Sequence, residues 1–247
     1  MNYDNEASEH LLRRLGSYTT ARVSRGRVER TERHALRLAR DARRLGLPAP
    51  KLSLIESLFR ETAEREFPDA DGIVRVEWSR LGEQAPELIA RHRSLGDSPP
   101  CWRACSAVTL HPGPEALRNT KAVTVPAYDS SREEMKRFGV EEVLLFDAAG
   151  ILVEGCRSNL LLVLEDDAFV TPDLSLGPVE GIGLQIVAES RSDLNFARVQ
   201  RDAVKSAKEI MAVNAVRGVV PVTELDQKPV GSGQAGPVAK SLASLFG

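Results

Sequence analysis

The chain has 247 residues, a formal net charge of −2 at pH 7 and a hydrophobic fraction of 42%, and this length allows one large or two small domains. The near-zero net charge excludes a global attraction to nucleic acid or to a membrane surface, and no stretch approaches the roughly 20 apolar residues that span a bilayer. The three cysteines are an odd number without zinc-ligand spacing, so we expect neither a disulfide framework nor structural zinc, and a reduced, cytoplasmic setting.

The N-terminal half is predicted to alternate between strands and helices. A turn at Gly26 separates two short strands, because β-branched and aromatic residues flank that glycine. Ser53 and Glu56 have the spacing of a capping box, which predicts the start of a helix. The predicted elements of this half are two strands within 17–30, a helix over 31–45, a helix ending near residue 65, a strand around 74–78 and a strand within 101–110.

The C-terminal half is predicted to be richer in strands. Ser130 and Glu133 are expected to cap a helix that ends at Gly139, and a turn at Ala149 and Gly150 joins two apolar strands. The predicted elements are strands at 142–147, 151–155 and 159–165, a helix over 181–191, a helical segment at 206–213, an apolar segment at 218–222 and a flexible connection or loop at 231–236.

The stretch HPGPEALRN, residues 111–119, is the best candidate for a linker, because two prolines and a glycine interrupt any regular element. The mixed order of helices and hairpins predicts an α+β fold in two lobes rather than a series of βαβ units. We therefore predict a smaller lobe at 1–111, a linker at 112–120 and a larger lobe at 121–247.

Sequence motifs exclude several common chemistries. The four histidines are scattered and no Cys-x-x-Cys or Asp-rich loop is present, so metal catalysis is not indicated. No Gly-x-Ser-x-Gly elbow or Walker-type loop occurs. Gly181-Ile182-Gly183 is too short to be a dinucleotide fingerprint.

A series of separated residues resembles the class IV aminotransferase family, the fold-type IV pyridoxal-phosphate enzymes, over about residues 16 to 230. In that family a lysine precedes a helix, a strand, an acidic turn, an E-G-x-x-x-N segment and T-P. The matching residues here are Lys121, the helix ending at Gly139, Asp147, Glu154 through Asn159, and Thr171-Pro172, with HALRL (34–38) matching H-x-x-R-L and GIG (181–183) standing where the family has G-I-T. The resemblance implies a two-lobed fold like that of D-amino acid aminotransferase and a homodimer.

The resemblance also implies that pyridoxal 5'-phosphate is the cofactor. Lys121 would hold it as a Schiff base and then serve as the base that moves the substrate's proton. Glu154 would face the pyridine nitrogen and keep it protonated. Without the family pattern, Lys121 would be an ordinary loop lysine and Glu154 an ordinary residue of a hairpin.

The phosphate end of the cofactor is less well matched. Arg37 would bind phosphate oxygens, although it stands in an arginine-rich helix that could be a solvated face. The backbone N–H groups of Ile182 and Gly183 would complete a phosphate cup at a helix start. Gly183 replaces the family's threonine, and Asn214 is a candidate to compensate. Tyr128 is a further cofactor-binding candidate near the phosphate or the Schiff base.

Two strings favour a lyase within the family. YTTARV (18–23) and NAVRGVVPV (214–222) resemble segments of 4-amino-4-deoxychorismate lyases, which release pyruvate to give 4-aminobenzoate in folate biosynthesis. In this interpretation Thr19, Thr20 and Arg118 are candidate substrate contacts.

Two alternatives remain open. One is an aminotransferase acting on branched-chain or D-amino acids, which would use the same Lys121 and Glu154 on another small amino-group substrate. The other is a cofactor-free binding protein. It is favoured by Gly183, by Leu184 in place of a frequent arginine, and by the apparent lack of the family's N-terminal hairpin and G-D-G segment.

Overall fold

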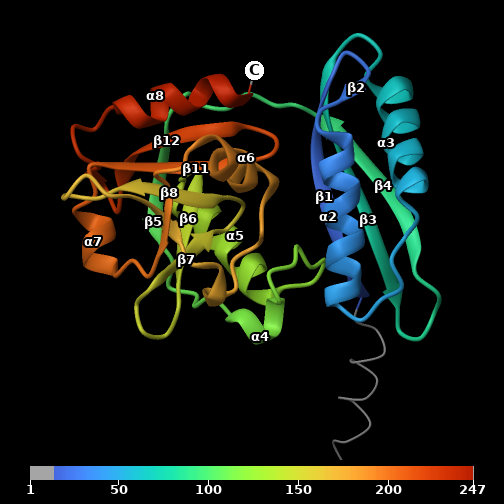
Figure 1. Cartoon of the computed structure of the whole chain (residues 1–247), viewed down its shortest axis with the longest axis horizontal. Helices are drawn as coiled ribbons and strands as arrows, with labels where there is room; N and C mark the ends of the chain where they lie inside the picture. Colours follow the sequence, from blue (N-terminus) through green and yellow to red (C-terminus); the bar gives the residue numbers. More distant parts are fainter. Residues whose placement is uncertain (1–13, 247) are drawn as a thin grey trace, which may run out of the picture. The chain divides into compact units, whose positions relative to one another are not determined.

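A computed structural model describes residues 14–246, and the contacts within the chain divide it into two compact units. Of the described residues, the first unit contains 14–96 together with Thr120–Val125, and the second contains Asp97–Asn119 and 126–246. Figure 1 shows the first unit mainly in blue and teal and the second from green to red.

The first unit is a four-stranded antiparallel sheet with two helices on one face (Figure 1). Its strand order is β2-β1-β3-β4. Alternate residues of β1 and β3 pack with the helices in an apolar core that includes Ala21, Phe59 and Val76. The elements are β1 (Arg14–Ser24), β2 (Arg27–Val28), β3 (Asp71–Leu81), β4 (Glu87–Ser94), α2 (Thr31–Arg44) and α3 (Leu52–Glu66).

The second unit is built on a nine-stranded mixed sheet with the order β10-β9-β8-β11-β12-β5-β6-β7, in which β13 pairs with β12. Its strands are β5 (Trp102–Ser106), β6 (Glu142–Phe146), β7 (Leu152–Gly155), β8 (Asn159–Val163), β9 (Phe169–Pro172), β10 (Asn195–Ala197), β11 (Glu209–Asn214), β12 (Gly218–Leu225) and β13 (Lys228–Pro229). Its helices are α4 (Pro114–Leu117), α5 (Pro126–Phe138), α6 (Ile182–Ser190), α7 (Arg201–Lys205) and α8 (Pro237–Ala243), with 3-10 turns η1 (Leu174–Leu176) and η2 (Ser244–Phe246).

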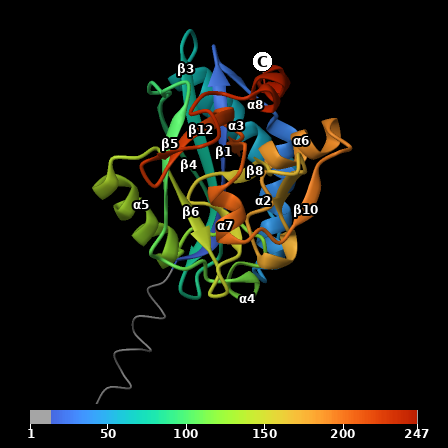
Figure 2. The same ribbon diagram turned by 90° about the vertical axis from the view of Figure 1, so that its left-hand side faces the viewer.

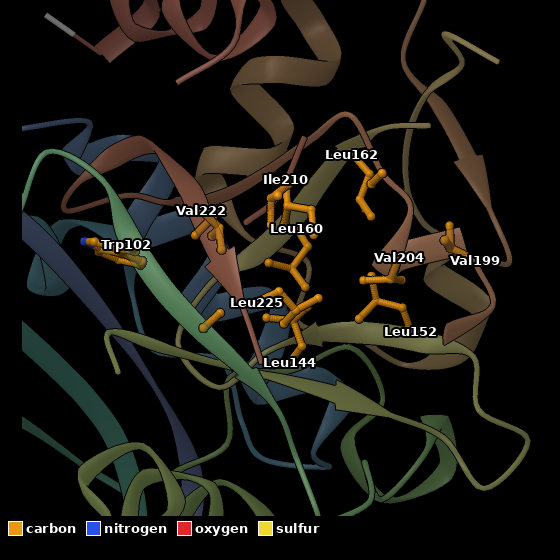
Figure 3. Packing of buried hydrophobic residues seen from close by; sticks show 14 of the residues in the cluster. Trp102, Leu144, Leu152, Leu160, Leu162, Val199, Val204, Ile210, Val222 and Leu225 are labelled. Carbon is orange, nitrogen blue, oxygen red and sulfur yellow. The ribbon is translucent and has the colours of Figure 1, made fainter. Parts of the chain in front are cut away.

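Apolar side chains cover both faces of the central strand β11. Ile210 packs in one cluster with Leu160 of β8 and Val204 of α7. Figure 3 shows this cluster from close by. Met211 packs in the other cluster with side chains of α6 and α8. Helix α5 packs against β6, and Figure 2 shows this helix at the margin of the second unit.

Most of the predicted elements are confirmed, but the segment 206–213 is not helical. Ser206 is the C-cap of α7, a bend follows at residue 208, and β11 begins at Glu209. Because both faces of β11 are buried, the strand has a continuous apolar sequence without the alternation that would have indicated a strand.

The two predicted capping boxes are wrong. Helix α3 begins at Leu52, with Lys51 as its N-cap and no capping side chain, so Ser53 already lies inside the helix. Helix α5 begins at Pro126, which places Ser130 in its interior. Proline is favourable at a helix start because its missing N–H has no partner there.

The segment predicted as a linker is part of the second unit. Residues 114–117 form α4, and the side chain of His111 is fully buried. Residues 120–125, which include Lys121, instead pair with β1 of the first unit. The contacts therefore divide the chain at other positions than the predicted lobes 1–111 and 121–247.

Candidate active site

Glu154 lies on β7 with only 3% of its surface exposed, and its carboxylate accepts three hydrogen bonds. Oε1 accepts from the hydroxyl of Tyr128 and from Nε2 of His111, at 3.2 Å. Oε2 accepts from the backbone N–H of Val179, at 3.0 Å. A carboxylate has about four acceptor positions, so Oε2 keeps one for a further donor. This arrangement suits a protonated ring nitrogen.

The hydrogen bonds of His111 fix which of its ring nitrogens carries the proton. The backbone N–H of Gly113 donates to Nδ1 at 3.1 Å, so Nδ1 is unprotonated. Nε2 is then the N–H donor to Glu154. Nothing in the local sequence indicated His111, because it precedes a proline-rich stretch and reaches Glu154 only through the fold.

The N-terminus of α6 is held close to Glu154 by the segment that follows η1. The side-chain amide of Asn159 donates to the carbonyl of Val179 at 2.8 Å. The backbone N–H of Val179 donates to Oε2 of Glu154. A Cβ on Gly181 would lie 2.1 Å from Oδ1 of Asn159, so only glycine fits there. Asn159 belongs to the E-G-x-x-x-N segment, and the structure gives it this positioning role.

Helix α6 begins with Gly181 as its N-cap and has no capping side chain. The first N–H groups of a helix lack intrahelical acceptors, which makes this end suited to an anion. Ile182 and Gly183 are both buried here. A Cβ on Gly183 would lie 2.9 Å from Cγ2 of Val213 and 3.0 Å from the carbonyl carbon of Asn214, so close packing between α6 and β11 explains the glycine.

Asn214 closes the turn between β11 and β12. Its Oδ1 accepts from the backbone N–H groups of Val216 at 3.0 Å and Arg217 at 2.9 Å. The carbonyl end of this side chain is therefore used locally, and only its amide group could compensate at a phosphate cup.

Lys121 belongs to the first unit, and its backbone is anchored at both ends. Its N–H donates to Oδ2 of Asp41 on α2 at 3.0 Å, and its carbonyl accepts from the N–H of Tyr18 at 2.9 Å. Nζ lies 5.1 Å from the centre of the Tyr18 ring. Within residues 14–246 no carboxylate forms an ion pair with this amine.

Arg37 is a buried cation on α2, with 6% of its surface exposed. Its Nη2 donates to Oγ1 of Thr19 at 2.5 Å, and that hydroxyl contacts Nδ1 of His34 at 2.6 Å. Burial lowers the pKa of Arg37 and outweighs the Asp41 carboxylate, which raises it. Burial, followed by the charge of Arg37, holds the pKa of His34 well below its usual value.

The polar atoms around Arg37 are incompletely paired. In the described part of the chain, its Nε is buried without a hydrogen-bond partner, as is Nε2 of His34. Arg37 also forms no ion pair with the described residues. A buried guanidinium without a direct ion pair and with an unpaired Nε is costly, which fits a site that receives an anion such as phosphate.

The remaining predicted residues fall in different places. Thr19 is fully buried and its hydroxyl is occupied by Arg37 and His34, which fits a positioning role better than the predicted substrate contact. Thr20 is half-buried on the other face of β1, and Arg118 is exposed at the end of α4. The hydroxyl of Tyr128, a predicted cofactor-binding residue, donates to Oε1 of Glu154.

A family model for class IV amino-transferases matches residues 16–225. The chain belongs to the class IV aminotransferase family. This confirms the resemblance at the level of the family, whose members use pyridoxal phosphate.

Curated relatives of the class IV family match part of the chain. A branched-chain-amino-acid aminotransferase from Pseudomonas aeruginosa is 28% identical over 133 residues, covering 51% of this chain and 43% of the relative. A D-alanine aminotransferase from Bacillus licheniformis is 27% identical over 109 residues, covering 43% of this chain and 38% of the relative. The chain therefore matches about two fifths of the length of these relatives.

Solved class IV structures share the fold. A putative branched-chain amino acid aminotransferase from Thermotoga maritima superposes with a TM-score of 0.83 at 20% identity, covering 100% of this chain and 89% of that one. An aminotransferase from Brucella abortus bound to pyridoxal phosphate gives a TM-score of 0.79 at 22% identity, covering 94% and 87%. The predicted two-lobed α+β fold of this family is confirmed.

Two further findings concern membrane-spanning helices and metal sites. None of the helices within residues 14–246 is long and apolar enough to cross a membrane. The same residues contain no group of histidine, cysteine and acidic side chains that could hold a metal ion.

Proposed function

We propose that this protein is a pyridoxal-phosphate-dependent aminotransferase that acts on small amino acids of the branched-chain or D- type. The family membership and the aminotransferase names of the relatives support this activity. The observation that carries the proposal is the Glu154 carboxylate, which is buried, held by three donors and left with one free acceptor position.

Pyridoxal phosphate supplies an aldehyde that accepts an amino group and a pyridine ring that withdraws electrons from the adjacent carbon. Lys121 would bind the cofactor through Nζ and then move a proton at the substrate's reacting carbon. Glu154 would accept the ring N–H. Arg37 and the first N–H groups of α6 would each bind phosphate oxygens.

A second candidate is a 4-amino-4-deoxychorismate lyase, which the YTTARV and NAVRGVVPV strings favour. Here Lys121 would remove the proton from the carbon that bears nitrogen, and pyruvate would leave as the ring becomes aromatic. The relatives named above are aminotransferases, so they support the first candidate better.

One experiment separates the candidates. The purified protein, supplied with pyridoxal phosphate, is incubated with L-valine, L-leucine or D-alanine plus 2-oxoglutarate, and separately with aminodeoxychorismate. We expect 2-oxo acid and glutamate in the first set and no 4-aminobenzoate in the second.

Lys121→Ala, with Lys136→Ala as a matched control on the exposed face of α5, shows whether the product depends on Lys121. Formation of 4-aminobenzoate without 2-oxo acid would replace the aminotransferase by the lyase. Turnover in neither set, with no bound cofactor, would favour the cofactor-free binding protein. We also propose that the protein is a cytoplasmic homodimer. Light scattering of the purified protein measures its mass and so tests the dimer.

A further inference from the structure

Asp41 is a fully buried acidic residue in the C-terminal half of α2. Aspartate is a poor helix former, and a buried carboxylate is costly unless its oxygens are paired. Oδ1 accepts from Nε and Nη2 of Arg40, both at 3.1 Å, and Oδ2 accepts from the backbone N–H of Lys121 at 3.0 Å. Because an apolar residue would suit the buried face of this helix better, the bond to Lys121 gives a physical reason for an aspartate at this position.

The hydrogen bond between Asp41 and Lys121 joins two parts of the first unit that are 80 residues apart in the sequence. Residues 120–125 belong to this unit, although the residues on both sides of them belong to the second. The carbonyl of Lys121 accepts from Tyr18, and the N–H of Val123 donates to Gly16, at 2.9 Å each. These two bonds hold the segment after the Cα of Lys121, and Asp41 holds the N–H before it.

A fixed backbone matters for Lys121 because Nζ stands at the end of a flexible four-carbon chain. Lysine is among the side chains that lose most rotamer freedom when they are immobilised, and a mobile backbone would add to that loss. Nζ lies 5.1 Å from the centre of the Tyr18 ring. The position of the amine therefore depends strongly on the Cα from which the side chain extends.

Asp41 also acts on Arg37, which lies one helical turn earlier on the same buried face of α2. Burial lowers the pKa of Arg37, and the charge of Asp41 raises it to a smaller extent. A substitution at Asp41 is therefore expected to affect the proposed phosphate-binding residue as well as Lys121, and a test has to separate these two effects.

We propose that Asp41 is a positioning residue, which holds the backbone of Lys121 so that Nζ is placed to bond with the aldehyde of pyridoxal phosphate. This inference rests on the proposed function and deepens it. In this role Asp41 acts through the main chain of Lys121. A preorganised amine favours the covalent bond because less conformational freedom is lost when that bond forms, and it leaves non-covalent binding of the ring and the phosphate unchanged.

Two ligands separate the position of Lys121 from the rest of the site. Nζ condenses with the aldehyde of pyridoxal phosphate and water is released. Pyridoxine 5'-phosphate has an alcohol in place of the aldehyde and can bind only non-covalently. Calorimetric titration of the full chain, dialysed free of cofactor, gives both dissociation constants. Their ratio measures the bond to Lys121, because an effect of Asp41 on Arg37 acts on both ligands and cancels.

In Asp41→Ala we expect this ratio to change on the order of 10-fold to the disadvantage of pyridoxal phosphate, because a hydrogen bond to a charged group is lost. Asp41→Asn keeps an oxygen that can accept from Lys121 and is expected to keep a ratio close to that of the wild type. Asp41→Leu fills the space of the carboxylate without an acceptor. It replaces Asp41→Ala if thermal unfolding shows that the alanine variant does not fold.

Two controls keep the wild-type ratio if the inference is correct. Arg40→Gln breaks the ion pair on the other oxygen of Asp41, and Glu61→Gln changes an exposed acidic residue of α3. An unchanged ratio in both Asp41→Ala and Asp41→Leu, or an equal change in Asp41→Asn or Arg40→Gln, would overturn the positioning role and leave the aminotransferase intact. A wild-type protein that forms no borohydride-stable adduct on Lys121 would instead overturn the proposed function, and the role of Asp41 with it.

Discussion

The side chains proposed to bind the two ends of the cofactor have opposite electrostatic surroundings. Three donors converge on the Glu154 carboxylate, which keeps one acceptor position for a further donor. Arg37 is buried beside a hydroxyl and an imidazole, and the nearby Asp41 carboxylate forms no direct ion pair with it. The Glu154 carboxylate can accept a further hydrogen bond, and the Arg37 guanidinium can bind an anion.

The residues that bear the proposed chemistry could be predicted from the sequence, but their supporting partners could not. Lys121, Glu154 and Arg37 stand at spacings typical of the family. His111 is 43 residues from Glu154, and its role depends on a backbone N–H that fixes its tautomer. Thr19 was expected to face substrate, but the alternation along β1 turns it toward α2.

The pH dependence of stability is expected to report on His34. An unfolded histidine has a pKa near 6.5, and burial places the folded value well below this. Between the two values only the unfolded chain binds the proton. The free energy of unfolding is therefore complete above about pH 6.5 and falls below it, by up to about 1.4 kcal/mol per pH unit.

His34→Leu is expected to flatten this decline, as measured by hydrogen exchange of the α2 amides between pH 5 and 8. The control is His92→Gln on β4, where the side chain is 44% exposed. An unchanged slope in His34→Leu would show that other groups cause the pH dependence.

At the scale of elements, the predictions failed where burial or backbone geometry overrode a local pattern. The segment containing β11 shows no alternation of apolar and polar residues, because apolar side chains cover both faces of the strand. Two capping boxes had the right spacing, but α3 and α5 start earlier, at Leu52 and Pro126. Elements with one buried face, such as α2 and β3, were predicted correctly because their periodicity survives.

The packing of α6 against β11 leads to a prediction for Gly183. Restoring the family's threonine in Gly183→Thr would press a Cβ against Val213 and Asn214. We expect a loss of about 1–3 kcal/mol of stability, and weaker rather than tighter binding of pyridoxal phosphate.

Thermal unfolding and cofactor titration of the alanine and threonine variants at position 183 measure these effects. Alanine adds only the Cβ and is expected to cost less than threonine. A threonine variant that is as stable as wild type and binds the cofactor more tightly would show that Gly183 is a defect of the cup rather than a packing requirement.

At the scale of the molecule, the proposed cofactor residues belong to two compact units. Lys121 and Arg37 lie in the first, and Glu154 and the start of α6 lie in the second. The sequence predicted two lobes but assigned Lys121 to the larger one, because its pairing with β1 is a long-range contact that no local pattern encodes.

The visible absorption spectrum after addition of pyridoxal phosphate tests the central claim most directly. We predict that the wild-type protein and Lys136→Ala develop the band of lysine-bound cofactor, and that borohydride then traps the adduct on Lys121. Lys121→Ala is predicted to lack both the band and the adduct. A wild-type protein that stays colourless, or a Lys121→Ala variant that keeps the band, would contradict the account.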